Sequence, residues 1–326
     1  MSRAVVIHAF GAPSTFRLEE REVPSPGPGK LTIKTHAAGV SFVDVLVSAG
    51  EYQLKPPLPF IPGSEFAGIV TAVGDGVDPA RIGQRVLASA FGGAFAEESI
   101  VPAKLALPIP ADMSFAEASV FRVSFATAYY ALIQRGRLKA GETVLVLGAG
   151  GAVGYAAIEV AKALGATVIG SASSNAKRAL AIAAGADAIV DSRSNTWRDD
   201  VKAANGGRAI DVVIDPIGGE ATERAFRSLA WNGRLLVIGF AGGSIARLPV
   251  NLALLKGAAL VGVDLRQFGD NEPEAAAANV AVLFELYEAG RLHPPIAKTY
   301  ALDDFAAAMV DASTGETAGR IVLTMR

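Results

Sequence analysis

The stretch that decides the fold is Thr143–Gly154, which reads TVLVLGAGGAVG. Its first part is a continuous apolar run, and its second part is a series of small residues that leads into the helical pattern Val153–Leu164. A strand, a glycine-rich turn and a helix in this order form the arrangement that holds a dinucleotide pyrophosphate. The glycines allow a tight turn close to the phosphates, and the helix N-terminus presents free N–H groups. The alternative, a plain strand–helix turn with small residues for packing, is disfavoured by the βαβ context.

The pattern around this stretch predicts two kinds of structure. Further short apolar runs follow it, with helical segments between several of them: Thr167–Gly170, Ala188–Val190, Asp211–Asp215, Arg234–Gly239 and Ala259–Val263. Such alternation is typical of a doubly wound parallel sheet, an α/β fold. In the first 120 residues, by contrast, short β-rich runs alternate with Gly–Pro turns, which predicts a barrel-like β unit. The last 60 residues contain one strong helical pattern, Pro273–Ala289, and a terminal strand, Arg320–Thr324.

Composition excludes several classes of protein. The chain has 326 residues, of which 51% are hydrophobic and 19% charged, as in a folded protein with a large core. The formal net charge of −2 argues against a nucleic-acid or anionic-membrane partner. The uncharged stretch Thr143–Ile158 is shorter than the about 20 apolar residues of a membrane span, and the break at Gly11 and Pro13 leaves no signal-peptide core. Cysteine is absent, which removes disulfides and thiolate metal sites. We therefore expect a cytoplasmic location.

The segment after the second strand of the parallel sheet predicts the choice of cofactor. A protein that prefers NAD usually carries an acidic residue there to hold the ribose 2′-hydroxyl. Here the strand runs into Ser171–Arg178, which reads SASSNAKR and holds no acid. The hydroxyl of Ser173 and the cations Lys177 and Arg178 suit a 2′-phosphate, which predicts NADPH. A helix capped by Ser173 or Ser174, with solvated cations, is compatible with the same residues.

Together these motifs resemble the medium-chain dehydrogenase/reductase superfamily, specifically its zinc-free quinone oxidoreductase (ζ-crystallin-like) branch. The resemblance extends over nearly the whole chain and rests on Gly39–Val45, Pro59–Gly68, Gly83–Val86, Leu138–Val146, Gly185–Asp187, Asp215–Gly219 and Gly319–Leu323. It implies a Rossmann domain inserted in a GroES-like β-barrel catalytic domain, with the active site in the cleft. The expected boundaries are 1–124 for the first part of the catalytic domain, 125–264 for the Rossmann domain and 265–326 for the returning part.

The resemblance also assigns residues. In the catalytic domain it implies roles for Tyr52, Ser41 and Asp44; Tyr52 is equally compatible with an aromatic pocket wall, and Asp44 with a loop-stabilising role. The cofactor-binding residues it implies, together with those of the glycine turn, are Thr127, Tyr130, Gly148, Gly151, Ala152, Val153, Gly154, Ser173, Lys177, Arg178, Ser192, Gly239, Phe240, Ala241, Val263 and Arg320.

Zinc-dependent relatives carry metal ligands where this chain has Ser64, and the three histidines show no ligand spacing, so we expect no metal. The chain departs from the family at Ser41 (usually Asn), Ser192 (often Tyr), Arg122 (usually Pro) and Arg266. The two arginines could border the cleft and face an anionic acceptor, or be structural; Asp264 and Glu117 are their expected partners.

The function that this implies is an NADPH-dependent, zinc-independent reductase that transfers hydride to a quinone or an α,β-unsaturated carbonyl. An enoyl-thioester (acryloyl-CoA-type) reductase and a non-catalytic, crystallin-like NADPH-binding protein are the alternatives. The expected partners are a small-molecule electron acceptor and a second copy in a homodimer, with no nucleic acid and no membrane.

Overall fold

The computed structural model describes residues 1–325 and divides the chain into two compact units. The barrel unit consists of Met1–Val123 and the chain from Pro294 onward, and the Rossmann unit consists of Ser124–His293. The first boundary lies within one residue of the expected one, but the second lies at His293 instead of residue 264. The difference arises because two helices pack within the Rossmann unit. On α8 (Leu265–Asn271) the Phe268 ring stacks on Tyr130 at 4.0 Å, and on α9 (Pro273–Glu288) Asn279 Oδ1 accepts a hydrogen bond of 2.8 Å from Gln134.

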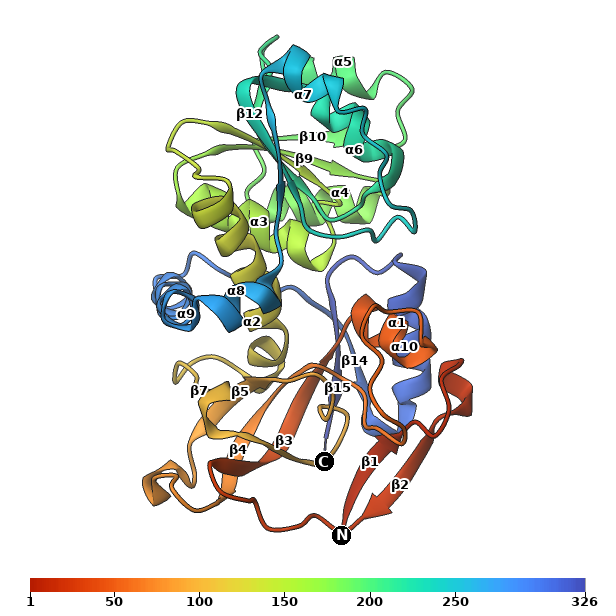
Figure 1. Ribbon diagram of the computed structural model, residues 1–326, viewed down its shortest axis with the longest axis vertical. Helices are drawn as coiled ribbons and strands as arrows, with labels where there is room; N and C mark the ends of the chain where they lie inside the picture. Colours follow the sequence, from red (N-terminus) through yellow and green to blue (C-terminus); the bar gives the residue numbers. More distant parts are fainter. Residues whose placement is uncertain (326) are drawn as a thin grey trace. The chain divides into compact units, whose positions relative to one another are not determined.

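The barrel unit is built on a seven-stranded sheet (Figure 1). Its order is β14 (Ile296–Ala301), β15 (Arg320–Thr324), β3 (Lys30–Val40), β4 (Glu65–Val73), β5 (Arg85–Ser89) and β7 (Ala106–Pro108), with β6 (Glu98–Pro102) also paired to β3. The strand β15 runs antiparallel to β3, so that a segment after the Rossmann unit in the sequence joins a sheet of segments that precede it. A two-stranded ribbon, β1 (Ser2–Val6) and β2 (Arg17–Arg21), and the helices α1 (Phe42–Ala49) and α10 (Phe305–Thr314) complete the unit. Apolar side chains such as Ile33, Phe66 and Phe95 are fully buried in its core.

Helix α10 is an element that the sequence analysis did not predict. Its segment is short and rich in alanine, so it carries only a weak amphipathic pattern. Its buried residues Phe305, Ala308 and Met309 belong to the core of the barrel unit. Tertiary packing therefore supplies the stabilisation that the local pattern does not predict.

The Rossmann unit contains the predicted parallel sheet, in the order β10 (Ala188–Asp191), β9 (Thr167–Ala172), β8 (Thr143–Leu147), β11 (Ile210–Asp215), β12 (Leu229–Val237) and β13 (Ala259–Gly262). The strand order reverses direction between β8 and β11. Right-handed crossovers place helices on both faces of such a sheet. Figure 1 shows α3 (Ala152–Ala163) and α4 (Asn175–Ala183) on one side, and α5 (Trp197–Ala204), α6 (Gly219–Phe226) and α7 (Asn251–Lys256) on the other. Ligands of these sheets bind at the carboxyl ends of the strands, beside the reversal.

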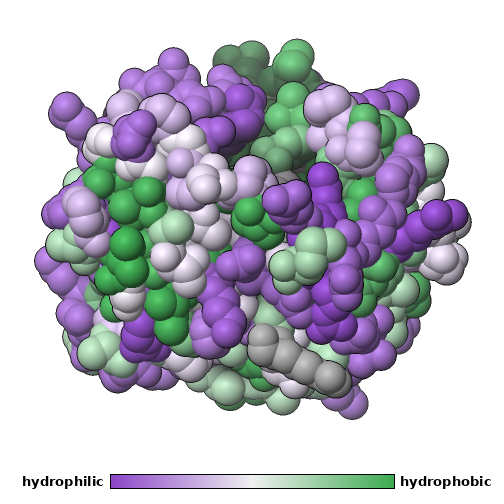
Figure 2. Space-filling view, turned by 90° about the horizontal axis from the view of Figure 1, so that it is seen from below, coloured by the Kyte–Doolittle hydropathy of each residue, from purple (hydrophilic) through white to green (hydrophobic). Residues whose placement is uncertain are grey.

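The helix α2 (Phe115–Tyr130) carries the chain from the first unit into the second, and a π-helical turn (Ala131–Arg135) follows it. Within residues 1–325, no helix has the length and apolar character that a membrane crossing requires. Figure 2 shows a mixed surface, on which hydrophobic residues lie in groups between hydrophilic ones.

Candidate functional site

The glycine turn in the Rossmann unit has the close packing that a phosphate-binding loop needs. Gly148 has a φ of +60°, in the left-handed region, and Gly151 is the N-cap of α3. A Cβ on Gly154 would lie 2.2 Å from the carbonyl oxygen of Gly148, and a Cβ on Gly150 would lie 2.5 Å from the Cβ of Lys177. The loop therefore tolerates only glycine at these positions, and α3 starts directly beneath it with Ala152 and Val153. This geometry leaves the N-terminus of α3 to receive an anion.

The cationic segment after β9 is held close to this loop. Ser174, not Ser173, caps α4, and its hydroxyl accepts a hydrogen bond from the Lys177 backbone. The Lys177 side chain packs against Gly150, whereas Arg178 is paired with Asp191 at 2.9 Å. Of the two predicted cations, Lys177 is thus the one that lies against the glycine turn.

Asp191 was not singled out in the sequence. It ends β10, accepts a hydrogen bond from the Arg193 backbone and lies 3.7 Å from the Arg193 guanidinium. Hydrogen bonding to Arg193 and the charge of Arg178 lower its pKa, so this carboxylate balances two cations near the predicted Ser192. Ser192 itself donates its backbone N–H to Ala172, at the end of β9.

The remaining predicted cofactor residues of the Rossmann unit lie at strand ends or on α2. Gly239, Phe240 and Ala241 follow β12, and Val263 follows β13. Asp215, at the end of β11, was missed: its Oδ1 accepts the backbone N–H groups of Ile217 and Gly218 at 2.9 Å each, and its Oδ2 accepts the hydroxyl of Thr222. The signal for it was present, because Asp215–Gly219 carries a motif of the family. Thr127 and Tyr130 are largely buried on α2.

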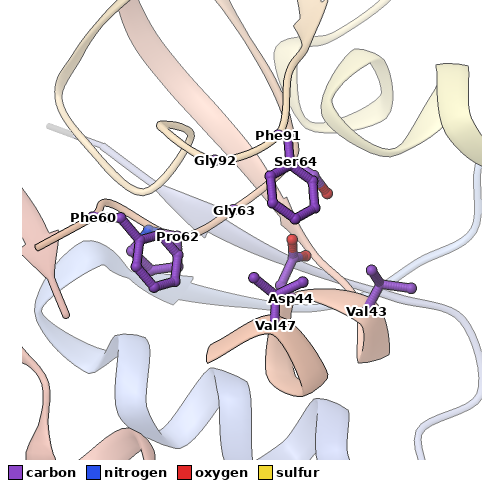
Figure 3. A pocket seen from close by; sticks show the side chains of 9 residues that line it. All are labelled: Val43, Asp44, Val47, Phe60, Pro62, Gly63, Ser64, Phe91 and Gly92. Atoms are coloured by element: carbon purple, nitrogen blue, oxygen red, sulfur yellow. The ribbon is translucent and has the colours of Figure 1, made fainter. Parts of the chain in front are cut away.

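The barrel unit holds a recess that includes one of the predicted catalytic residues, Asp44. It is lined by Val43, Asp44, Val47, Phe60, Pro62, Gly63, Ser64, Phe91 and Gly92, and its only polar side chains are those of Asp44 and Ser64. Figure 3 shows the carboxyl group of Asp44 pointing from α1 toward Ser64 and Phe91. Val43 and Phe91 are 40% and 49% exposed, and the recess is a small cavity of about 30 Å³ with mainly apolar walls.

Ser41 and Asp44 form a capping box at the start of α1. The hydroxyl and the backbone N–H of Ser41 donate to Asp44 Oδ2 at 2.6 and 2.8 Å, and the Asp44 N–H donates back to Ser41. Burial raises the pKa of Asp44, while hydrogen bonds from Ser41 and Ser64 and the charge of Arg320 oppose that rise. The structure therefore supports a structural role for Asp44, and it also brings the carboxyl group to the recess.

A second buried carboxylate, Glu65, follows Ser64 directly. Its Oε1 accepts the Val123 N–H at 2.8 Å, and its Oε2 lies 3.7 Å from the Arg320 guanidinium. Burial raises the pKa of Glu65 to about 7 in spite of the charges of Arg320 and Arg122. Arg320, expected at the cofactor, is only 6% exposed and lies inside the barrel unit.

The two unusual arginines have different surroundings. Arg122 donates to the Ser89 hydroxyl and lies in the field of Glu65, and burial lowers its pKa. Its expected partner, Glu117, is instead part of a capping box with Ser114, so that expectation is wrong. Arg266 is exposed and pairs with Asp264 and Asp270. Asp264 was its expected partner, and Asp270 was not predicted.

Tyr52 lies in a bend after α1 and is not among the residues that line the recess. The histidines lie apart: His8 is paired with Glu19, His36 stacks on Phe115, and His293 contacts Glu159. Over residues 1–325 the His, Asp and Glu side chains form no group of three that could hold a metal ion.

Comparison with known proteins gives the family. Residues 27–111 match the alcohol dehydrogenase GroES-like domain, and residues 152–281 match the domain described as zinc-binding dehydrogenase. The mouse quinone oxidoreductase-like protein 2 is 36% identical over 93% of this chain and 87% of its own length. The chain belongs to the medium-chain dehydrogenase/reductase superfamily, in its quinone oxidoreductase-like branch.

Two further relatives of this branch align over nearly their whole length. Human quinone oxidoreductase is 31% identical over 100% of this chain and 98% of its own. A mycobacterial structure solved in complex with NADPH has a TM-score of 0.90 and 30% identity, covering 99% of this chain and 100% of its own. Both predicted folds, the GroES-like unit and the Rossmann unit, are thereby confirmed.

Proposed function

We propose that this quinone oxidoreductase-like protein is an NADPH-dependent reductase that transfers hydride to a quinone or an α,β-unsaturated carbonyl without zinc. The observation that carries the proposal is the position of Lys177, packed on Gly150 of the glycine turn, beside a strand end that has no acidic residue. A cation there favours the 2′-phosphate of NADPH. Because no acidic residue follows this strand, the usual hydrogen bond to the ribose 2′-hydroxyl of NAD cannot form. The mycobacterial relative solved with NADPH supports this assignment.

The proposal assigns the dinucleotide to the Rossmann unit and the acceptor to the recess of the barrel unit. The glycine turn and the N-terminus of α3 would hold the pyrophosphate, with Lys177 at the 2′-phosphate. Bound NADPH supplies the hydride. The apolar side chains that line the recess, with Asp44 and Ser64 beside them, would contact one end of a conjugated acceptor.

A zinc-independent reaction follows from the residues present. The chain has no cysteine, and Ser64 occupies the place of a metal ligand in zinc-dependent relatives. Without a Lewis acid to stabilise an alkoxide, a conjugated acceptor that yields a delocalised enolate or phenolate is the better substrate. Metal-free activity is therefore part of the proposal.

The test is an NADPH-consumption assay across quinones, enones and enoyl-CoA thioesters, with and without a chelator. Turnover of quinones or enones that survives the chelator supports the proposal. A strong preference for enoyl-CoA would assign the enoyl-thioester reductase alternative. NADPH binding with no turnover of any acceptor would identify a non-catalytic, crystallin-like protein.

We also propose a homodimer as the working form. The edge strand β13 has a single neighbour, β12, and apolar side chains on and near it are widely exposed: Trp231 by 75%, Leu254 by 82% and Leu260 by 50%. An apolar sheet edge is an aggregation hazard unless another chain covers it. A second copy that pairs edge to edge about a twofold axis would cover it symmetrically.

A further inference from the structure

The carboxyl end of β9 is covered by an arginine at the place where proteins that prefer NAD carry an acid. No acidic residue lies between Thr167, where β9 begins, and Arg178 on α4. The guanidinium of Arg178 instead donates hydrogen bonds to the Ala172 carbonyl at 3.3 Å and to the side-chain oxygen of Asn175. Because Ala172 is the last residue of β9, Arg178 closes the end of this strand with a positive charge.

The neighbouring strand supplies an acid beside the same point. Asp191 is the last residue of β10, and in the parallel pairing of β10 with β9 its register partner is Ala172. Neighbouring strands lie about 4.8 Å apart. The Rossmann unit therefore contains a carboxylate one strand away from the usual position of the NAD-binding acid. That carboxylate is paired, because Asp191 Oδ2 lies 2.9 Å from the Arg178 guanidinium.

Asp191 could accept a further hydrogen bond if Arg178 were absent. Its Oδ1 accepts the Arg193 backbone N–H at 2.9 Å, and its side chain is 39% exposed. An ionised carboxylate has about four acceptor positions. Without Arg178, it would offer an oxygen to a ribose hydroxyl, which favours NADH, and a negative charge to a 2′-phosphate, which disfavours NADPH.

The two adjacent cations of α4 have different surroundings. The Lys177 side chain packs against Gly150 in the glycine turn, whereas Arg178 contacts the end of β9 and the carboxylate of Asp191. The charge of Arg178 is thus shared with an acid that lies 2.9 Å away. The two cations should therefore act differently on the choice of cofactor.

We propose that Arg178 masks Asp191 and thereby excludes NADH from the cofactor site. Asp191 then takes the part of the missing NAD-binding acid, and its ion pair with Arg178 keeps it from a ribose 2′-hydroxyl. Arg178 is a specificity-determining residue that acts through Asp191. The inference rests on the proposed function, because it explains the NADPH preference that this function includes.

The test measures dissociation constants for NADH and NADPH by fluorescence titration of the full-length protein, with no electron acceptor present. Arg178→Ala should tighten NADH binding about 10-fold, because the freed carboxylate gains a hydrogen bond to the ribose, and it should weaken NADPH binding. Asp191→Asn keeps an oxygen for the Arg193 N–H, and alone it should tighten NADPH binding, because Arg178 loses its partner. The double variant should return NADH affinity to the wild-type value.

Two controls separate the mask from a loss of folding. Arg227→Ala removes another arginine of the Rossmann unit that is paired with one carboxylate, Glu223, at 2.6 Å, and it should change neither dissociation constant. Thermal unfolding is recorded for every variant. If Arg178→Ala does not fold, Arg178→Gln takes its place, since it keeps an N–H donor for the Ala172 carbonyl and carries no charge.

The possible failures of the mask and of the proposed function differ. If Arg178→Ala weakens NADPH binding with no gain for NADH, or if a gain for NADH persists in the double variant, the mask is wrong and the proposed function stands. If the wild type binds NADH as tightly as NADPH, the cofactor preference in the proposed function is contradicted as well, because no exclusion of NADH exists.

Discussion

At the scale of single residues, buried carboxylates have different roles. Asp215 accepts three hydrogen bonds and shapes the turn after β11, whereas Asp44 both caps α1 and faces the recess. Glu65 lies between two arginines and a backbone N–H. What distinguishes these groups is their partners, since a buried charge is stable only when it is paired or hydrogen-bonded.

Lys177 gives the residue-scale prediction for the cofactor. Lys177→Ala should raise KM for NADPH by about 10- to 100-fold more than KM for NADH, because it removes a charge-assisted contact with the 2′-phosphate. Lys162→Ala is the control, since Lys162 pairs with Asp187. Steady-state kinetics with both cofactors measure the ratio, and equal changes for NADPH and NADH would show that Lys177 is only a packed helix residue.

Glu65 predicts a dependence of stability on pH. Its pKa is raised from 4.5 to about 7 in the folded state, so the folded protein binds this proton more tightly than the unfolded chain. The stabilisation is present at low pH and is lost as pH rises from about 4.5 to about 7. Glu65→Gln should therefore flatten the decline of Tm across this interval. The partly exposed Glu98→Gln is the control, and identical slopes in wild type and Glu65→Gln would contradict the prediction.

At the scale of elements, the helices α1, α3 and α4 begin with different kinds of N-cap. Ser41 and Asp44 start α1, Ser174 starts α4, and Gly151 starts α3. The first two use side-chain oxygens to satisfy the free N–H groups of the helix, whereas Gly151 provides no side chain and leaves those N–H groups for an anion. The start of α3 therefore differs from the starts of α1 and α4 in having no side-chain cap.

Gly154 gives the element-scale prediction. In Gly154→Ala the new Cβ would meet the carbonyl oxygen of Gly148 at 2.2 Å, so the glycine turn must shift. We expect a loss of about 1–3 kcal/mol in unfolding free energy and weaker NADPH binding. Gly269→Ala on α8 is the matched control, because its Cβ meets nothing within 4 Å, and it should stabilise by about 0.5–1 kcal/mol. Urea unfolding and fluorescence titration measure both quantities; unchanged NADPH affinity in Gly154→Ala would contradict the assignment of the loop.

At the scale of the whole molecule, the chain interrupts one domain with another. The barrel unit needs both ends of the chain, because β15 pairs with β3, and the Rossmann unit lies between them in the sequence. The barrel sheet is therefore assembled from segments on both sides of the Rossmann unit in the sequence.

The edge strand β13 gives the prediction at this scale. Leu260→Glu should convert the proposed dimer into a monomer, because a charge would have to be buried at the sheet edge. Ile182→Glu, which changes an apolar residue 59% exposed on α4, is the control and should leave the mass unchanged. Light scattering at several concentrations measures the mass. A monomeric wild type, or a dimer that survives Leu260→Glu, would contradict the proposed interface.

The sequence by itself determined the fold, and it predicted the glycine turn to which we assign the cofactor. The strand Thr143–Leu147 has the same bounds in the sequence and in the structure, and α3 begins within one residue of its predicted start. The glycine turn and the cations after β9 could also be found from the sequence. These features are local: periodicity, turn residues and caps act between neighbours along the chain.

Only the tertiary structure decided which distant residues meet. It paired Glu65 with Arg320 and Arg178 with Asp191. It also placed Ser64, noted in the sequence only for the metal ligand it replaces, in the same recess as Asp44. It also moved the second domain boundary to His293, because α8 and α9 pack within the Rossmann unit. The physical reason is that contacts between segments far apart in the chain depend on the path of the folded backbone, and burial then sets the pKa values of the acids they enclose.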